Sequence, residues 1–276
     1  KKNTTDWSTV SATLENDIYK ATVTGLEPET TYESRLVCNY DADVFEGDVK
    51  EFTTETATAL YNGGFDNWYQ NQKAWYPIAE TDATSFDNYK GYLKSFWDSG
   101  NLGAATMNKN PTTQETSDVH SGSSAKLASQ FVGLLGIGKF AAGNLYTGHY
   151  YETIKNPMGA KLFFGQPFVS RPTKLKGWFK YTRGSNVNYG DDPYKSELEA
   201  TDGDQCAIYI ALADNVGLDG GGQNYAFEID NTLSADDPNN FKYKNTIDFS
   251  EANKNIIAYG TISETEAKGT GSWQEF

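Results

Sequence analysis

The side chains best suited to chemistry lie in one alternating stretch, residues 174–181, where a tryptophan stands among lysines. Trp178 shares one face of the expected strand with Lys176 and Lys180, because successive strand side chains point to opposite faces. An indole ring can stack against the C–H groups of a sugar, and ammonium groups can bind its hydroxyls. The same residues also fit a tryptophan that is covered by another layer of the protein.

Two further aromatic side chains have neighbours that suit a sugar ligand. Tyr209 lies between alanines on the smaller face of its expected strand, where small residues can form a groove floor. Trp97 precedes Asp98 and lies close to Asn101, in a turn-rich segment that could rim a cleft. For both aromatic residues, packing between sheets is the alternative.

Motifs that suggest a catalytic or nucleotide site are incomplete. Residues 133–140, GLLGIGKF, have the glycine and lysine spacing of a phosphate-binding loop, but Phe140 stands where a magnesium-binding Ser or Thr is needed. No strand–helix–strand unit surrounds the motif, so we interpret the match as accidental. Neither His120 nor His149 has a second histidine or a cysteine nearby, which disfavours zinc. A glycosidase needs a suitably spaced carboxylate pair, and sequence alone cannot pair the 37 acidic residues.

The charge balance excludes several ligands. The formal net charge is −14, which disfavours nucleic acid and anionic lipid, since both require a basic surface. No apolar run is long enough to span a membrane. Cys38 and Cys206 lie far apart in strand-like segments, so we expect two buried free thiols.

Residues 1–55 read as a β-rich first domain. The segment VTGLEPETTYESRLV (23–37) resembles the later strands of a fibronectin type III or immunoglobulin-like sandwich. That resemblance implies a corner role for Tyr32, with its hydroxyl bound to backbone. Because such a sandwich needs about 100 residues, we expect further strands upstream in the parent protein.

Residues 56–60 read as a short linker without Pro or Gly, and residues 61–276 as a second domain. Short apolar alternations recur between turn residues, and no helix of convincing length is visible apart from one possible turn at 248–254. The predicted fold is therefore all-β, with an incomplete fibronectin-like sandwich followed by an antiparallel jelly-roll sandwich.

The second domain also resembles a known family, the "putative carbohydrate metabolism domain" of surface lipoproteins from gut Bacteroidota. The motifs that carry this resemblance are spread over 61–276 in one order: NGGFDNW (62–68), FWDSGNLG (96–103), GSSAKL (122–127), AAGNLYTG (141–148), KGWFKY (176–181), DGDQCAIYIAL (202–212) and SWQEF (272–276). The family pattern continues past SWQEF, so we expect further strands downstream.

The resemblance implies a jelly-roll module that handles carbohydrate, in a secreted or outer-membrane protein with a lipid anchor elsewhere in the parent chain. Sugar-binding jelly rolls often hold a structural calcium. Here Asp66, or Asp202 and Asp204 in a turn, could supply oxygen ligands to it.

Three hypotheses remain open at this point. The first is a non-catalytic module that binds an oligo- or polysaccharide, supported by the aromatic strands and the family resemblance. The second is a glycoside hydrolase or lyase on the same fold, which requires paired carboxylates, one with a raised pKa. The third is a structural or adhesive surface protein whose aromatic residues are all core.

Overall fold

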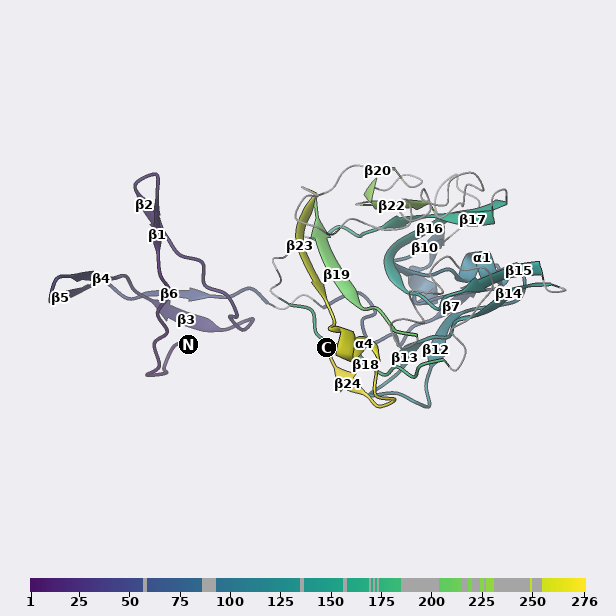
Figure 1. Cartoon of the computed structure of the whole chain (residues 1–276), viewed down its shortest axis with the longest axis horizontal. Helices are drawn as coiled ribbons and strands as arrows, with labels where there is room; N and C mark the ends of the chain where they lie inside the picture. The colour runs from purple at the N-terminus through teal and green to yellow at the C-terminus, as the bar shows by residue number, and fades with distance from the viewer. Residues whose placement is uncertain are drawn as a thin grey trace. The chain divides into compact units, whose positions relative to one another are not determined.

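The computed structural model of the chain divides into two compact units (Figure 1). One consists of 1–60 with 170–174, and the other of 61–169 with 175–276. The structure describes residues 1–56, 59–85, 93–134, 137–155, 158–168, 170, 172, 174–184, 204–214, 218–219, 224–225, 227–230, 249 and 255–276.

The first unit contains three antiparallel strand pairs. They are β1 (Thr13–Glu15) with β2 (Ile18–Lys20), β3 (Thr31–Ser34) with β6 (Lys50–Thr53), and β4 (Val37–Tyr40) with β5 (Asp43–Glu46). Tyr32 on β3 stacks on Phe52 of β6, and its hydroxyl accepts a hydrogen bond of 2.8 Å from the backbone N–H of Glu27. The backbone bond predicted for this tyrosine is therefore confirmed.

Many apolar side chains of the first unit are exposed. Tyr19, Tyr40 and Phe45 are all more than half exposed, and the core residues found in the described chain all belong to the second unit. Cys38 is exposed and Cys206 half-buried, both as free thiols. The prediction of two buried thiols was wrong: Cys206 is only half-buried, and the strands of the β4–β5 hairpin that carries Cys38 are exposed along their whole length.

The main sheet of the second unit has four antiparallel strands. Their order is β11 (Trp97–Asp98), β16 (Tyr146–Lys155), β17 (Met158–Phe164) and β22 (Phe227–Asp230). Gly148 on β16 has φ +141°, and a Cβ at this position would lie 2.1 Å from the carbonyl oxygen of Phe163. Only glycine permits this close approach of two strand backbones.

The other strands that the structure describes in the second unit form two-stranded pairs. They are β7 (Tyr69–Asn71) with β8 (Ala74–Tyr76), β9 (Thr84–Ser85) with β10 (Leu93–Lys94), β12 (Thr112–Glu115) with β13 (Ser124–Leu127), β14 (Gln130–Leu134) with β15 (Ile137–Ala141), β18 (Trp178–Phe179) with β24 (Gln274–Glu275), β19 (Tyr209–Ala213) with β23 (Ile256–Thr261), and β20 (Leu218–Asp219) with β21 (Asn224–Tyr225). In Figure 1 the β18–β24 pair lies near the C-terminus, beside the short helix α4 (Glu264–Ala267).

The prediction of an all-β chain is confirmed. Within the described ranges the only helical segments are α4, α1 (Asn101–Ala105) and the 3-10 turn η1 (Glu80–Asp82). None of these helices approaches the length needed to cross a bilayer. The GLLGIGKF segment contributes to β14 and β15, a hairpin without the helix that a phosphate-binding loop requires. The turn predicted at 248–254 lies outside the described residues, except for Phe249.

The core of the second unit is built where α1 meets β8 and β16. Its buried apolar residues are Ala74, Tyr76, Ile78, Leu102, Ala105 and Tyr150. The start of α1 is fixed by Asn101, a fully buried side chain that bridges three backbone groups. Its amide nitrogen donates to the carbonyls of Trp75 and Thr112, and its amide oxygen accepts from the N–H of Thr112. These bonds join α1 to β8 and β12, and so fix the framework from which the β12–β13 loop projects.

Candidate functional site: an aromatic cluster between charged pairs

The site begins with the short strand pair β18–β24. Trp178 lies opposite Glu275, and Phe179 lies opposite Gln274. The pair is extended by reciprocal backbone hydrogen bonds between Gly177 and Phe276, at 3.2 and 2.9 Å. Because directly opposed residues share a face of an antiparallel pair, the register places Trp178 and Glu275 on the same face.

The opposite face of this pair supplies its packing. Phe179 and Phe276 meet edge to face with ring centroids 6.0 Å apart, and both are half-buried. Tyr181 donates a 2.7 Å hydrogen bond to Asp204, and burial together with this carboxylate raises the pKa of the tyrosine well above its ordinary value. The apolar side of the predicted alternation thus anchors the strand and leaves the tryptophan side outward.

A loop from elsewhere in the sequence completes the outward face. The connection between β12 and β13 brings His120 onto Trp178, with ring centroids 3.8 Å apart and planes inclined by only 11°. Trp273 also lies near this imidazole, with ring centroids 6.2 Å apart and an interplanar angle of 59°. We call Trp178, His120 and Trp273 the aromatic cluster. Trp178 remains 48% exposed, so part of its ring is open to a ligand.

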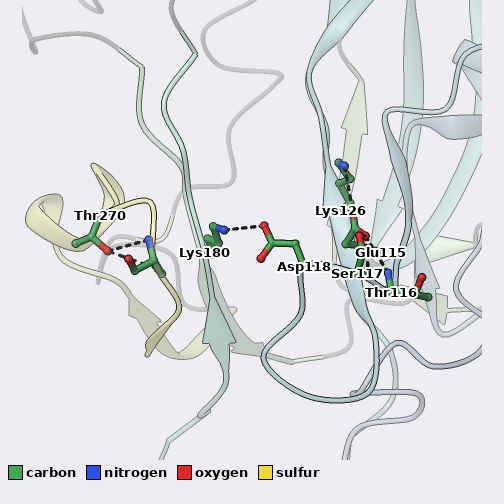
Figure 2. A network of polar contacts seen from close by, with 8 residues as sticks. Glu115, Thr116, Ser117, Asp118, Lys126, Lys180 and Thr270 are labelled. Atoms are coloured by element: carbon green, nitrogen blue, oxygen red, sulfur yellow. Dashed lines mark hydrogen bonds and ion pairs between the residues drawn. The ribbon is translucent and has the colours of Figure 1, made fainter.

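The loop that carries His120 is held by a carboxylate at its start (Figure 2). One oxygen of Glu115 accepts hydrogen bonds from the N–H groups of Thr116 and Ser117 and from the Ser117 hydroxyl, at 3.0, 2.9 and 2.6 Å. Its other oxygen meets Lys126 Nζ at 2.9 Å. These bonds favour the ionised form and hold the pKa of Glu115 far below its usual range.

The far end of the same loop is also fixed by a carboxylate. Asp66, in the opening turn of the second unit, accepts hydrogen bonds from the N–H and the hydroxyl of Ser123, at 3.1 and 2.9 Å. Gly122 approaches the same carboxylate so closely that a Cβ would lie 2.8 Å from it. His120 is therefore presented by a loop that is fastened at both ends, which limits the entropy lost when a ligand binds.

Two ion pairs flank the aromatic cluster. Lys180 Nζ lies 2.6 Å from Oδ2 of Asp118, which lies on the β12–β13 loop, and Figure 2 shows this contact. Lys176 Nζ lies 3.3 Å from Glu275 Oε1. The hydrogen bond from Lys180 is the main cause of a lowered pKa at Asp118.

Trp273 has an unusual polar atom. Its indole Nε1 is buried and forms no hydrogen bond of normal geometry in the described part of the chain, although the N–H lies near enough to Asp118 to help lower the pKa of that carboxyl.

The structure brings together the three residues predicted on the lysine face, Trp178, Lys176 and Lys180. Sequence reasoning missed their partners from other segments. Trp273 and Glu275 alternate within SWQEF and could have been recognised as one face of a strand. Nothing local in the sequence marks His120 or Asp118, because only the tertiary fold carries the β12–β13 loop to this strand.

Two polar residues predicted beside Trp97 lie inside the second unit. Asp98 is 1% exposed, and its two oxygens accept hydrogen bonds from the N–H groups of Ser99 and Tyr150, both at 2.7 Å. Asn101 has the bridging role described above. Trp97 itself donates its indole N–H to the carbonyl of Tyr61 and packs against other aromatic rings. These contacts place all three among the residues that build the fold.

Tyr209 belongs to a separate aromatic group on the β19–β23 pair. Its ring lies 5.2 Å from Phe249 and 6.2 Å from Tyr259, and it remains 44% exposed. Desolvation raises the pKa of its hydroxyl. Phe249 stacks on Tyr259 with ring centroids 4.4 Å apart, and Tyr259 is also 44% exposed.

The candidate calcium ligands do not form one cluster in the described chain. Asp66 binds Ser123, as described above. Asp204 accepts from the Tyr181 hydroxyl and from the N–H of Gln205. Asp202 lies outside the described residues. Among the residues that the structure does describe, no group of three or more His, Cys, Asp or Glu is arranged to hold a metal ion.

Comparisons with known proteins give one assignment. No curated protein matches the chain, and no solved structure matches it either. A family model described as "Putative carbohydrate metabolism domain" matches residues 64–276. This range covers nearly the whole second unit, including every residue of the aromatic cluster, and it is well over half of the 276 residues. The chain therefore belongs to the putative carbohydrate metabolism domain family.

Proposed function

We propose that the second unit is a non-catalytic carbohydrate-binding module and that the aromatic cluster is its binding site. The observation that carries this proposal is a half-exposed tryptophan held in place by a stacked imidazole. An aromatic ring that is fixed before the ligand arrives loses little conformational entropy on binding. Its free surface can cover the apolar face of a sugar ring.

The groups around the cluster suit the polar edge of a saccharide. Donors and acceptors lie beside the rings in two ion pairs, Lys176 with Glu275 and Lys180 with Asp118. Sites for small ligands typically combine an apolar surface with a few convergent polar groups of this kind. Membership of the family supports a role in carbohydrate metabolism but leaves open whether the role is binding or catalysis.

One carboxylate beside the aromatic cluster, Asp118, lacks the property that the acid of a glycosidase needs. A glycosidase requires an acid whose pKa is raised, so that it is protonated when it meets the glycosidic oxygen. The pKa of Asp118 is instead lowered, because Lys180 stabilises its ionised form. A glycan-binding module, placed on the surface of a secreted or lipid-anchored protein, is therefore our preferred assignment. A structural calcium elsewhere in the second unit remains part of this proposal.

A glycan array with the full 276-residue chain tests the proposal. We expect binding to one class of saccharide that is lost or strongly reduced in Trp178→Ala. Phe140→Ala is a matched control, because Phe140 is an aromatic residue on another strand with a similar exposed fraction of 44%. Binding that survives in Trp178→Ala but is lost in Tyr209→Ala would move the site to the β19–β23 pair. No binding by the folded wild type would favour the structural or adhesive role.

A further inference from the structure

We infer that the aromatic cluster selects uncharged saccharides, and that Asp118 and Glu275 are the residues that exclude anionic ones. This inference rests on the proposed function and adds the ligand class. Lysines on both sides of Trp178 would by themselves attract uronates and sulfated sugars.

The structure pairs each of these lysines with a carboxylate from another segment. Lys180 meets Asp118 of the β12–β13 loop at 2.6 Å, and Lys176 meets Glu275 of β24 at 3.3 Å. The four formal charges at the cluster therefore sum to zero. Lys126, on β13, is also paired with a carboxylate, since its Nζ lies 2.9 Å from Glu115 Oε2.

An anionic sugar would have to compete with both carboxylates for the ammonium groups. Like charges placed across an interface oppose binding, and the net charge of −14 on the whole chain adds repulsion at long range. An aspartate with an ordinary or lowered pKa is ionised at neutral pH, and the pKa of Asp118 is lowered, so this repulsion is present under physiological conditions.

The same ion pairs can serve a neutral sugar well. Each ammonium group has three donors, and each carboxylate has two acceptor oxygens, of which these contacts use Asp118 Oδ2 and Glu275 Oε1. A donor and an acceptor side by side match the neighbouring hydroxyl groups of a pyranose, which both donate and accept. Hydroxyls can therefore bind without breaking either ion pair.

The test compares matched neutral and acidic ligands at pH 7.5. The probes are gluco-, manno- and galacto-hexasaccharides and the same chains with C6 oxidised to carboxylate, measured by isothermal titration calorimetry with the full chain. We expect the wild type to bind a neutral probe at least about tenfold more tightly than its acidic counterpart. The double variant Asp118→Asn, Glu275→Gln should bind the acidic probe about tenfold more tightly than the wild type does. That gain should weaken with added salt, because it comes from exposed charges.

The controls separate failure of the inference from failure of the proposed function. Glu275→Gln alone changes an exposed residue and leaves the loop contact of Asp118 intact, so it reports the effect even if the double variant unfolds. If the wild type binds the acidic probe as tightly as the neutral one, and Trp178→Ala abolishes both, the site is confirmed and its selectivity is not. If no probe binds the folded wild type, the proposed function and the inference both fail.

Discussion

Replacing Trp178 by alanine should weaken saccharide binding by about tenfold or more, with only a small loss of stability. The side chain is 48% exposed, and an indole offers about 250 Å² of surface, so about 120 Å² is open to solvent. A sugar ring that covers half of this area removes about 60 Å² from water. At about 25 cal/mol per Å² this contributes about 1.5 kcal/mol, equivalent to slightly more than tenfold in Kd.

The stability change should be smaller, because the lost contact is local. Trp178→Ala removes the stacking on His120, which contributes about 0.5–1.5 kcal/mol in aromatic pairs. The packing of Phe179 on Phe276 behind the strand is retained. Trp178→Phe keeps a ring of smaller area and should show an intermediate affinity.

Isothermal titration calorimetry with the best array ligand gives the affinities, and urea denaturation gives the free energy of unfolding. Phe140→Ala is again the control for loss of an exposed ring. The reasoning is refuted if Trp178→Ala is as stable as the wild type and binds with unchanged Kd. It is also refuted if Trp178→Phe binds more weakly than Trp178→Ala, since affinity would then not follow ring area.

Other predictions concern the framework and the loop. Asp98→Ala should lower the free energy of unfolding by about 3 kcal/mol, because it leaves two buried N–H groups without their acceptor; urea denaturation measures this, and an unchanged midpoint would contradict it. Gly148→Ala should cost at least about 2 kcal/mol, since its Cβ would clash with the Phe163 carbonyl; a melting temperature equal to that of wild type would be inconsistent with the described strand pairing. The lowered pKa of Asp118 means that its contact with Lys180 stabilises the fold above the ordinary carboxyl pKa of 3.8 and is lost only as pH falls through the lower folded value. Protonation of Asp118 should therefore cause no loss of saccharide binding between pH 7 and pH 5. The Asp118→Asn variant should show the same pH profile of binding over that range, and a different profile would argue against the assignment.

Much of the local structure could be predicted from sequence periodicity. The alternation of residues 174–181 separated a lysine and tryptophan face from an apolar face, and the register with β24 has that arrangement. The resemblance of residues 23–37 to a fibronectin-like sandwich predicted the backbone hydrogen bond of Tyr32. The described residues of the glycine-rich segment 133–140 belong to strands β14 and β15, which fits the interpretation that its match to a nucleotide motif is accidental. In each case the deciding interactions are between neighbours in sequence or within one strand, where the two-residue period applies directly.

Sequence periodicity did not predict which side chains are buried or which distant residues they contact. Asp98 and Asn101 have the composition of a cleft rim, yet both are fully buried because the start of α1 packs against β8. Cys38 reads as buried but is exposed. Whether a polar side chain faces solvent depends on which layer covers it, and that layer comes from residues distant in sequence.

The candidate site shows most clearly which features follow from the sequence and which depend on the tertiary structure. The sequence by itself determined that Trp178 lies between two lysines on one strand face, because alternation is a property of the strand. Only the tertiary structure decided that His120 stacks on this tryptophan and that Asp118 and Glu275 neutralise the lysines. Those contacts join segments more than fifty residues apart, and their free energy exists only once the chain has closed the intervening loops.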